Sequence, residues 1–174
     1  MYIDELIKTL NKFNKENINK INELKEKILK TKLNNGIVYL VGNGGSSSIA
    51  SHVSTDLLKA CKIKSKTFHD VNLITCYSND YGYEFWLSKA IEDVCNKDDL
   101  LIAISSSGNS KNIINAAKAM KKIGADVFTL TGFEENNQLK IENNGIWIDS
   151  NNYNIVEATH LVILLDQIEL LAIK

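Results

Sequence analysis

The sequence predicts an α/β protein of three layers, in which helices flank a doubly wound parallel sheet and a helical arm precedes the first strand. Short apolar runs alternate with helical patterns along the 174 residues, as in sheets built from strand–helix–strand units. Two runs, residues 37–41 and 100–104, are apolar at every position, which is typical of strands buried on both faces. The pattern favours one domain over residues 1–174, with a sheet of about four or five strands.

Residues 1–33 are predicted to form the N-terminal helical arm. Apolar residues recur at helical spacing from Ile3 to Phe13 and again from Ile18 to Leu29, on either side of a polar interruption. One bent helix and two consecutive helices fit this pattern equally well. An arm of this length carries more apolar surface than one sheet edge covers. We therefore expect it to pack on its own sheet and also to take part in oligomerisation.

Helical and extended patterns alternate over the rest of the chain. Helical patterns cover residues 49–60, 71–95 with a loop-like interruption at 79–83, 111–123 and 155–173. Extended segments are predicted at residues 65–69, 126–131 and 146–149, and residues 132–144 are polar and irregular around a short helix.

The two fully apolar strands are each followed by a loop of glycine, serine and asparagine. Residues 42–48 read GNGGSSS and residues 105–110 read SSSGNS, and each loop runs into a helical pattern. Glycine lets the backbone approach an anion, and the amides of a helix N-terminus and the serine hydroxyls can hold a phosphate with little positive side-chain charge. A single such loop also occurs as a simple turn. Because parallel strands end on the same side of a sheet, the two loops together predict one phosphate-binding crevice.

Composition and charge narrow the classes of partner. A net charge of −1 argues against general attraction to nucleic acid or to anionic membranes. No apolar run approaches the roughly 18 residues that span a bilayer, and the first residues lack the pattern of a signal peptide. Cys61, Cys76 and Cys95 show no CxxC spacing, which indicates buried, reduced thiols. We expect a cytoplasmic protein with no nucleic-acid and no membrane partner.

His52 and Asp56 lie one turn apart in the helix predicted after the first loop. This spacing places them on one helix face, where they could supply two ligands to a divalent metal or act as a base with its orienting partner. A polar pair on a solvated or subunit-facing surface has the same spacing. The pattern alone does not decide among these interpretations.

Five short motifs together resemble those of the sugar isomerase (SIS) domain family and, within it, the phosphoheptose isomerases. They are GNGGS at residues 42–46, HDV at 69–71, NDYGYE at 79–84, SSSGNS at 105–110 and LTG at 130–132. The resemblance covers nearly the whole chain. It implies an isomerase that converts sedoheptulose 7-phosphate to an aldoheptose 7-phosphate for bacterial surface polysaccharides. It also implies a homotetramer with sites near subunit contacts, and a zinc ion, which many members bind.

Carried over residue by residue, the resemblance assigns a set of substrate-binding positions. Those around the phosphate are Ser46, Ser105, Ser106, Ser107 and Ser110, and Gly44 in the first loop is a further substrate-binding position. Those near the sugar are Asn43, Asp70 and Asn154. The serine positions agree with the crevice inferred from the two loops.

The catalytic and metal-binding positions of the family match this sequence less well. His52 matches a histidine metal ligand, but Asp56 stands where the family has a catalytic, metal-binding glutamate. Glu157 stands at the glutamine ligand, and the catalytic histidine falls on Leu165, whose alkyl side chain moves no proton. Asp56 and Glu157 are then the carboxylates available for proton transfer, and His52, Asp56 and Glu157 the ligands available for zinc. A shifted register that makes His160 the catalytic histidine spoils the start of the helix.

Two classes of function fit these residues. The first is an aldose–ketose isomerase, in which a base removes a proton beside the carbonyl, an enediol(ate) forms and the proton returns to the neighbouring carbon. Its substrate is the heptose phosphate or a different phosphosugar. The second is a non-catalytic protein that binds a sugar phosphate or another protein, as the replication initiator-associating member of the family does. The two serine loops and His52 favour the isomerase.

Overall fold

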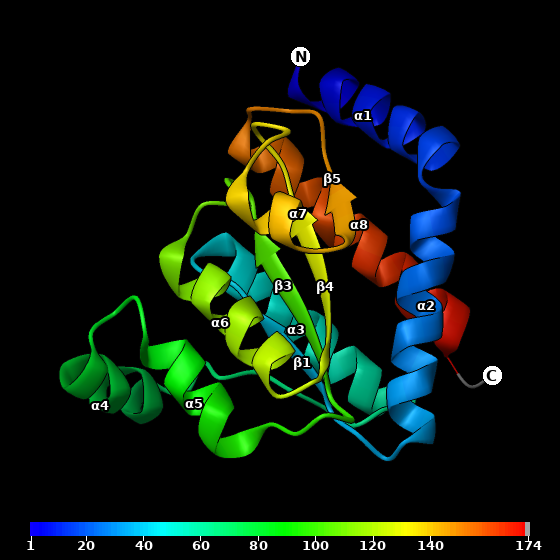
Figure 1. Cartoon of the computed structure of the whole chain (residues 1–174). Coiled ribbons are helices and arrows are strands. Elements are labelled where there is room, and N and C mark those ends of the chain that lie inside the picture. The colour runs from blue at the N-terminus through cyan, green and yellow to red at the C-terminus, as the bar shows by residue number, and fades with distance from the viewer. Residues whose placement is uncertain (173–174) are drawn as a thin grey trace.

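A five-stranded parallel sheet lies at the centre of the computed structural model, between two layers of helices (Figure 1). The structure describes residues 1–172, apart from the side chains of residues 15 and 16. The strands are β1 (Val38–Val41), β2 (Ser65–Lys66), β3 (Leu100–Ser105), β4 (Asp126–Thr131) and β5 (Gly145–Trp147), in the order β2-β1-β3-β4-β5. All four pairings are parallel. The predicted three-layer α/β fold is confirmed.

Burial on both faces explains why β1 and β3 read as unbroken apolar runs. Successive side chains of a strand point to opposite faces, and here both faces meet a helical layer. Leu40 and Ile102 pack into one hydrophobic core, whereas Tyr39 and Leu101 pack into the other. Every residue of β1 and β3 is buried, and Ser105 at the end of β3 is the one polar residue in the two strands.

The helices divide between the two faces of the sheet. The first core contains side chains of α2 (Ile18–Leu33), α3 (Gly45–Lys59) and α8 (Tyr153–Leu171). The second contains those of α5 (Trp86–Val94), α6 (Lys111–Lys122) and α7 (Gln138–Glu142). None of the helices in the described part of the chain is long and apolar enough to cross a membrane.

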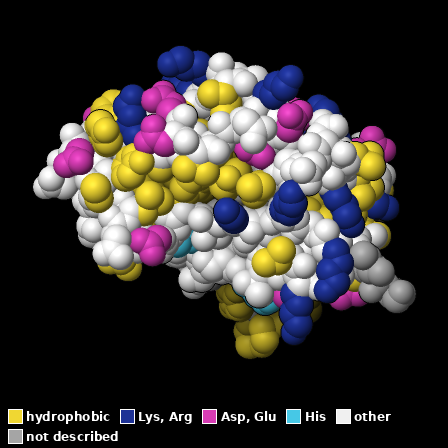
Figure 2. Space-filling model, turned by 90° about the horizontal axis from the view of Figure 1, so that it is seen from below, with side chains coloured by type: hydrophobic (Ala, Val, Ile, Leu, Met, Phe, Trp, Pro, Cys, Tyr) yellow, Lys and Arg dark blue, Asp and Glu magenta, His cyan; other side chains and the backbone are white. Residues whose placement is uncertain are grey.

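Helix α4 (Val71–Tyr81) packs on the outside of α5 and buries none of its residues fully. Its exposed side chains include Val71 and Tyr81, at 71% and 49% exposure. Seen from below, hydrophobic side chains gather at the end of the molecule that carries α4 and α5 (Figure 2). Helix α4 thus leaves hydrophobic side chains exposed at this end of the single chain.

The N-terminal arm consists of two helices, α1 (Tyr2–Glu16) and α2, which meet at Asn17. Helix α2 buries Leu24 and Ile28 in the first core, so it is part of the domain. Helix α1 packs on α8 and leaves Ile3 and Ile7 exposed at 59% and 52%. Of the two alternatives left open by the sequence, the structure has the two-helix form.

Several boundaries differ from those predicted. Helix α3 begins at Gly45 rather than at residue 49, because the serines after the glycines already form its first turn. Strand β2 spans two residues rather than 65–69, and the break between α4 and α5 lies at residues 82–85, where Gly82 has φ 84°. The thiol of Cys76 is exposed, contrary to the expectation that all cysteines are buried. Residue 173, expected to extend the last helix, lies outside the described residues.

The strand order fixes where a ligand can approach the sheet. From β1 the chain passes to β2 on one side, whereas β3 lies on the other side of β1. Such a reversal leaves a crevice outside the carboxyl ends of the two adjacent strands, which is where doubly wound sheets bind their ligands. The loops that follow β1 and β3 are the two glycine–serine loops of the sequence.

Candidate functional site

A pocket of about 240 Å³ lies at the carboxyl ends of β1 and β3, between the two serine loops. Its lining residues are Asn43, Gly44, Gly45, Ser46, Ile104, Ser105, Ser106, Ser107, Ser110, Tyr153 and Glu157. The loops converge as the sequence predicts, and the five serines assigned to the phosphate line the pocket together with Gly44. No lysine or arginine is among the lining residues.

Two helix N-termini open into this pocket. Helix α3 starts after Gly44, which has φ 54°, and helix α6 starts after Ser110. Neither N-cap residue caps its own helix with a side-chain hydrogen bond. The first amides of each helix therefore keep hydrogens to donate, and the helix dipoles favour a negative charge there. This arrangement suits a phosphate in a pocket without basic side chains.

The serine hydroxyls differ in how they are already used. Ser105 Oγ donates to Ser110 Oγ at 3.4 Å, and Ser107 Oγ accepts from the amide of Asn109 at 3.3 Å. Ser106 is 4% exposed, and its buried Oγ has no partner among the described residues. A buried hydroxyl without a partner is uncommon in folded proteins. The hydroxyl of Ser106 is thus available to donate a hydrogen bond to a ligand in the pocket.

Asn43 holds the two sides of the pocket together. Its side-chain amide exchanges two hydrogen bonds with that of Asn112, at 3.0 and 2.9 Å, and Tyr83 Oη donates to Asn43 Oδ1 at 3.3 Å. The loop after β1 is thereby tied to the first turn of α6. Asn43 could be assigned from its motif, but its two partners could not, because residues 40 and 69 positions away in the chain share no pattern with it.

Glu157 brings a carboxylate to the pocket wall. It lies in the second turn of α8, whose start is capped by Asn152, and it is half-buried. A β carbon built on Gly45 would lie 2.3 Å from Glu157 Oε2, so the carboxylate rests against the backbone at the start of α3. Tyr153 comes from the same helix and was not singled out in the sequence. The pocket thus combines donors for an anion with one acid–base group.

Asp70 and Asn154 do not line the pocket. The Asp70 carboxylate caps α4, where Oδ1 accepts from the amides of Asn72 and Leu73 at 2.9 and 3.1 Å. Asn154 lies in an adjacent groove of about 350 Å³ that also reaches Glu157, and its carbonyl accepts from Tyr2 Oη at 3.2 Å. Their assignment to the sugar remains a prediction.

Helices α3 and α8 run side by side in the same direction (Figure 1). Glu157 meets Gly45 where both helices begin, and Cys61 Sγ lies 3.7 Å from the carbonyl of Ile168 near their ends. His52 follows Gly45 by seven residues, roughly 10 Å along the helix axis, and Asp56 follows it by eleven, roughly 16 Å. The serine pocket therefore contains Glu157 but neither His52 nor Asp56.

His52 and Asp56 bind each other, with Nε2 and Oδ2 3.1 Å apart. Within residues 1–172 no three His, Cys, Asp or Glu side chains come together as a set that could hold a metal ion. The three ligands predicted for zinc, His52, Asp56 and Glu157, are thus not assembled within one chain. Because two side chains are a poor set for zinc, which takes four ligands, the arrangement does not fit the ion.

His160 is fully buried and lies outside the pocket. Its Nε2 lies 3.1 Å from the carbonyl of Thr131 in β4, and its Nδ1 has no partner among the described residues. Burial lowers the pKa of His160 to about 4, against a smaller opposing effect of the Thr131 carbonyl, so the ring is neutral at pH 7. The alternative alignment, in which His160 is the catalytic histidine, is therefore not supported, because His160 does not reach the pocket.

His69 is a further histidine near the loop after β1. Its Nδ1 lies 3.1 Å from Ser51 Oγ in α3, and its Nε2 is buried without a partner among the described residues. Burial lowers the pKa of His69, and the backbone of Gly42 partly opposes this effect. His69 therefore packs as a neutral ring behind the loop rather than in the pocket.

Comparison with known proteins identifies the class. Residues 1–132, well over half of the chain, match the SIS domain family. The order of the parallel strands and the pocket between two serine loops agree with this match. The chain belongs to the SIS domain family.

Within that family the chain is similar to phosphoheptose isomerases. It is 31% identical over 176 residues to the phosphoheptose isomerase of Helicobacter pylori strain P12, an alignment that covers 93% of this chain and 92% of that protein. It is 39% identical over 130 residues to that of Histophilus somni strain 2336, covering 71% and 67%. The solved structure of phosphoheptose isomerase GmhA from Neisseria gonorrhoeae has a TM-score of 0.92 at 23% identity, covering 98% of this chain and 95% of that one.

Proposed function

We propose that the protein is an aldose–ketose isomerase of a sugar phosphate, with sedoheptulose 7-phosphate as its first candidate substrate. The observation that carries this proposal is the pocket in which two serine loops and two uncapped helix N-termini surround a space bordered by the Glu157 carboxylate. The similarity to phosphoheptose isomerases over 93% of the chain supports the choice of a heptose phosphate.

In this proposal the phosphate binds between the loops and orients the rest of the sugar. The amides that begin α3 and α6 donate to the phosphate oxygens, and Ser106 Oγ gains the acceptor that it lacks. Hydrogen bonds of this kind fix a ligand without a salt bridge. The carbonyl end of the sugar then extends along the pocket wall toward α8.

Glu157 is the proposed acid–base group. A carboxylate there would take the proton from the carbon beside the carbonyl, and the electron pair would move onto the carbonyl oxygen to give an enediol(ate). The protonated Glu157 would return the proton to the former carbonyl carbon, while the hydroxyl proton transfers between the two oxygens. Asp56, the other predicted catalytic carboxylate, pairs with His52 away from the pocket, and no step is assigned to it.

A second candidate function is the binding of a sugar phosphate without turnover. The pairing of Asp56 with His52 and the alkyl side chain of Leu165 favour it, because both leave Glu157 without a partner for proton transfer. The serine pocket serves this function equally well.

One experiment separates the two functions. The purified full-length protein is incubated with sedoheptulose 7-phosphate, and the aldoheptose product is followed by NMR, with Glu157→Gln as the matched variant. The isomerase proposal expects product from the wild type and at least a tenfold lower rate from the variant. Binding by calorimetry with no product would establish the second function, and neither binding nor product would refute both.

A further inference from the structure

Tyr153 is the one polar side chain in the lining of the serine pocket to which the proposed function gives no role. In that function the serines hold the phosphate and Glu157 transfers the proton, while the side-chain amide of Asn43 exchanges hydrogen bonds with that of Asn112. Tyr153 is 57% exposed, and its hydroxyl forms no hydrogen bond within the described residues. An aromatic side chain with an unpaired hydroxyl therefore borders the pocket.

Helix α8 places Tyr153 beside Glu157 on one helix face. Tyr153 is the first residue of α8, and Glu157 follows it by four residues, one turn or roughly 6 Å along the helix axis. The side chain of Asn152 accepts from the amide of Asn154 at 3.0 Å, which fixes the first turn of the helix. A ligand whose reacting carbons lie at Glu157 therefore has the Tyr153 ring one turn away.

Phe133 fixes the position of the Tyr153 ring. The two ring centroids lie 4.6 Å apart with an angle of 68° between the planes, which is the edge-to-face contact that aromatic pairs prefer. Phe133 lies in the loop after β4, where its amide donates to the carbonyl of Ser150 at 3.0 Å and its carbonyl accepts from Trp147 Nε1 at 3.1 Å. The backbone of Phe133 is thus tied to β5 and to the segment that leads into α8.

The backbone of Phe133 is strained. Its φ of 56° lies in the left-handed region, which a residue with a large side chain rarely adopts. Such residues persist only where the surrounding structure holds them, and they are frequent at ligand sites. Asn35 and Lys62, the other non-glycine residues with positive φ in the described part of the chain, precede β1 and β2 at the opposite end of the sheet. The strain at Phe133 thus coincides with the wall of the serine pocket.

We propose, on the basis of the proposed function, that Tyr153 binds the carbon chain of the phosphosugar and that Phe133 is its positioning residue. A sugar carries C–H and O–H groups side by side. The Tyr153 ring can cover the C–H groups, and its hydroxyl can donate to or accept from a sugar hydroxyl. Inorganic phosphate has no carbon chain to lie on the ring, so the contribution of Tyr153 is specific for the sugar.

The test measures the affinity of the full-length protein for sedoheptulose 7-phosphate and for inorganic phosphate by calorimetry. We expect Tyr153→Ala to weaken binding of the sugar phosphate about tenfold and to change that of inorganic phosphate less than about twofold. Tyr153→Phe keeps the ring and loses the hydroxyl, so its loss should be smaller, about threefold.

The role of Phe133 is tested with Phe133→Asn, because asparagine tolerates a positive φ but provides no ring for Tyr153 to pack on. This variant should also bind the sugar phosphate more weakly and inorganic phosphate as before. In a Tyr153→Ala background it should have no further effect. A Phe133 that only maintained the fold would instead alter both affinities in either background.

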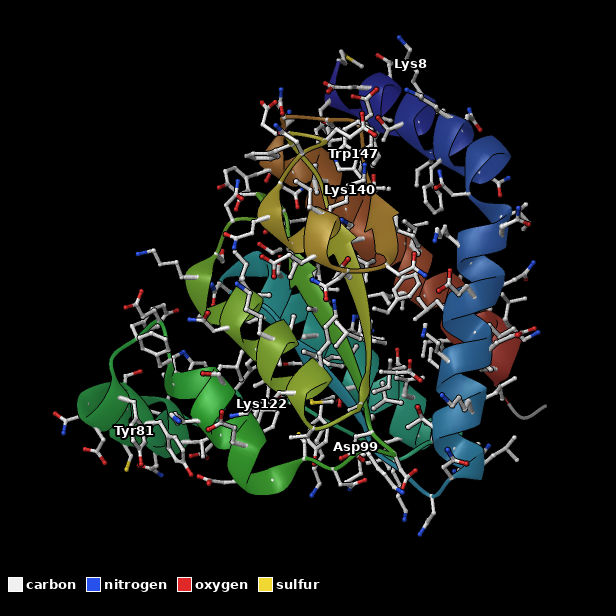
Figure 3. All side chains as sticks on the ribbon, in the orientation of Figure 1. Lys8, Tyr81, Asp99, Lys122, Lys140 and Trp147 are labelled. Atoms are coloured by element: carbon white, nitrogen blue, oxygen red, sulfur yellow. The ribbon has the colours of Figure 1, made fainter. Side chains whose placement is uncertain are left out.

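Tyr81→Ala is the matched control. Tyr81 is a tyrosine of similar exposure, 49%, and its ring also contacts another aromatic ring, that of Tyr77 at 5.7 Å between centroids. It lies on α4, at the opposite end of the molecule from Trp147 (Figure 3). Both affinities of this variant should equal those of the wild type.

The outcomes separate this inference from the proposed function. An unchanged affinity of Tyr153→Ala for the sugar phosphate, or equal losses for both ligands, overturns the role of Tyr153 and leaves the phosphate pocket in place. A wild type that binds neither ligand refutes the proposed function and this inference with it. Absence of product from a protein that shows the expected binding losses would contradict the isomerase proposal and still support this inference.

Discussion

The carboxylate of Glu157 lies against Gly45, at the point where α8 and α3 begin side by side. A β carbon on Gly45 would lie 2.3 and 2.8 Å from the two carboxylate oxygens, closer than unbonded atoms approach. Glu157 keeps its position at the wall of the serine pocket because residue 45 has no side chain. Glycine is thus required here by a close approach, and not by its backbone angles.

Gly45→Ala should therefore displace the proposed acid–base group while leaving the fold intact. The obstacle is the end of a flexible side chain, and Gly45 does not have a positive φ, so alanine can adopt its backbone conformation. We expect kcat for the phosphosugar to fall by about 10²-fold, the lower end of the usual contribution of a positioned acid–base group, with little change in melting temperature. Steady-state assays and thermal unfolding measure the two quantities.

The control for this prediction is the same substitution in a Glu157→Ala background. Without the carboxylate, the methyl group added by Gly45→Ala meets no obstacle, so the substitution should change neither turnover nor stability further. Equal effects of Gly45→Ala in both backgrounds would show that position 45 acts independently of Glu157.

Ser106→Ala should weaken phosphosugar binding, because it removes a hydroxyl that lines the pocket. The hydroxyl lines the pocket and has no partner in the described structure, so a bound phosphate would be its first acceptor. Hydrogen bonds to charged groups contribute about 1.5–3 kcal/mol, and we expect a loss of that size by calorimetry. Ser78→Ala is the matched control, because Ser78 Oγ is also buried without a partner but lies on α4. Equal affinities of all three proteins would contradict the phosphate assignment.

The sequence was sufficient for those parts of the fold that depend on local pattern. Strand β1 and residues 100–104 of β3 are apolar at every position because both faces of these strands are covered, and the loops that follow carry enough glycine and serine to be recognised. The length of β2 was predicted too long, as residues 65–69. Only Ser65 and Lys66 pair with β1, and this depends on the edge of the sheet and not on the segment itself.

The site was predictable only where it is contiguous in the chain. The serine positions of the two loops follow from their motifs. The contact of Glu157 with Gly45 joins residues 112 positions apart and depends on how α8 packs on α3. Tyr153 reaches the pocket for the same reason. Conversely, the spacing of His52 and Asp56 correctly indicated neighbours on one helix face but gave no information on their distance from the serines.

The stability of the protein should decrease as the pH falls below about 6.5, in part because of His160. Its pKa is about 4 in the folded state and about 6.5 when exposed, so the unfolded state binds more protons between these values. The contribution of His160 to stability is complete above its unfolded-state pKa of about 6.5, and it is lost as the pH falls toward its folded-state pKa of about 4. By pH 5 the loss from this group is about 2 kcal/mol.

His160→Gln isolates this effect, because a glutamine can still donate to the carbonyl of Thr131 but does not titrate. Urea unfolding at pH 7.5 and pH 5 should show a smaller decrease in the free energy of unfolding for the variant than for the wild type. His69 and the acidic residues remain in both proteins, so their contributions cancel. Parallel pH dependences would mean that His160 is not neutral in the folded state.

The exposed face of α1 should contribute to self-association. Ile3 and Ile7 lie one turn apart and are more than half exposed, whereas α2 is built into the core and cannot be removed cleanly. We expect the Ile3→Lys, Ile7→Lys double variant to form a smaller species than the wild type by light scattering. Ile141→Lys on α7, at 69% exposure, serves as the control. A monomeric wild type would contradict the prediction directly.

Leu165→His should create a zinc site from side chains of a single chain, where residues 1–172 bring no three candidate ligands together. Glu157 and Gly45 lie side by side, and α8 and α3 run in the same direction. Residue 165 is eight residues after Glu157, so it lies level with the residue eight positions after Gly45, which is in the turn between His52 and Asp56. Leu165 is half-buried, so an imidazole there can reach the space beside α3. His52 and Asp56 already lie 3.1 Å apart, and a third ligand would complete the minimum set for zinc.

We expect the Leu165→His variant to retain zinc through gel filtration, measured by elemental analysis, whereas the wild type retains little. A Leu165→His, His52→Ala double variant should lose the metal again, which distinguishes a designed site from adventitious binding. Leu161→His, one turn nearer Glu157, is the matched control, because it lies beside Ile49 rather than beside the His52–Asp56 pair. Equal zinc contents of the 161 and 165 variants, both folded, would show that α8 does not bring residue 165 to that pair.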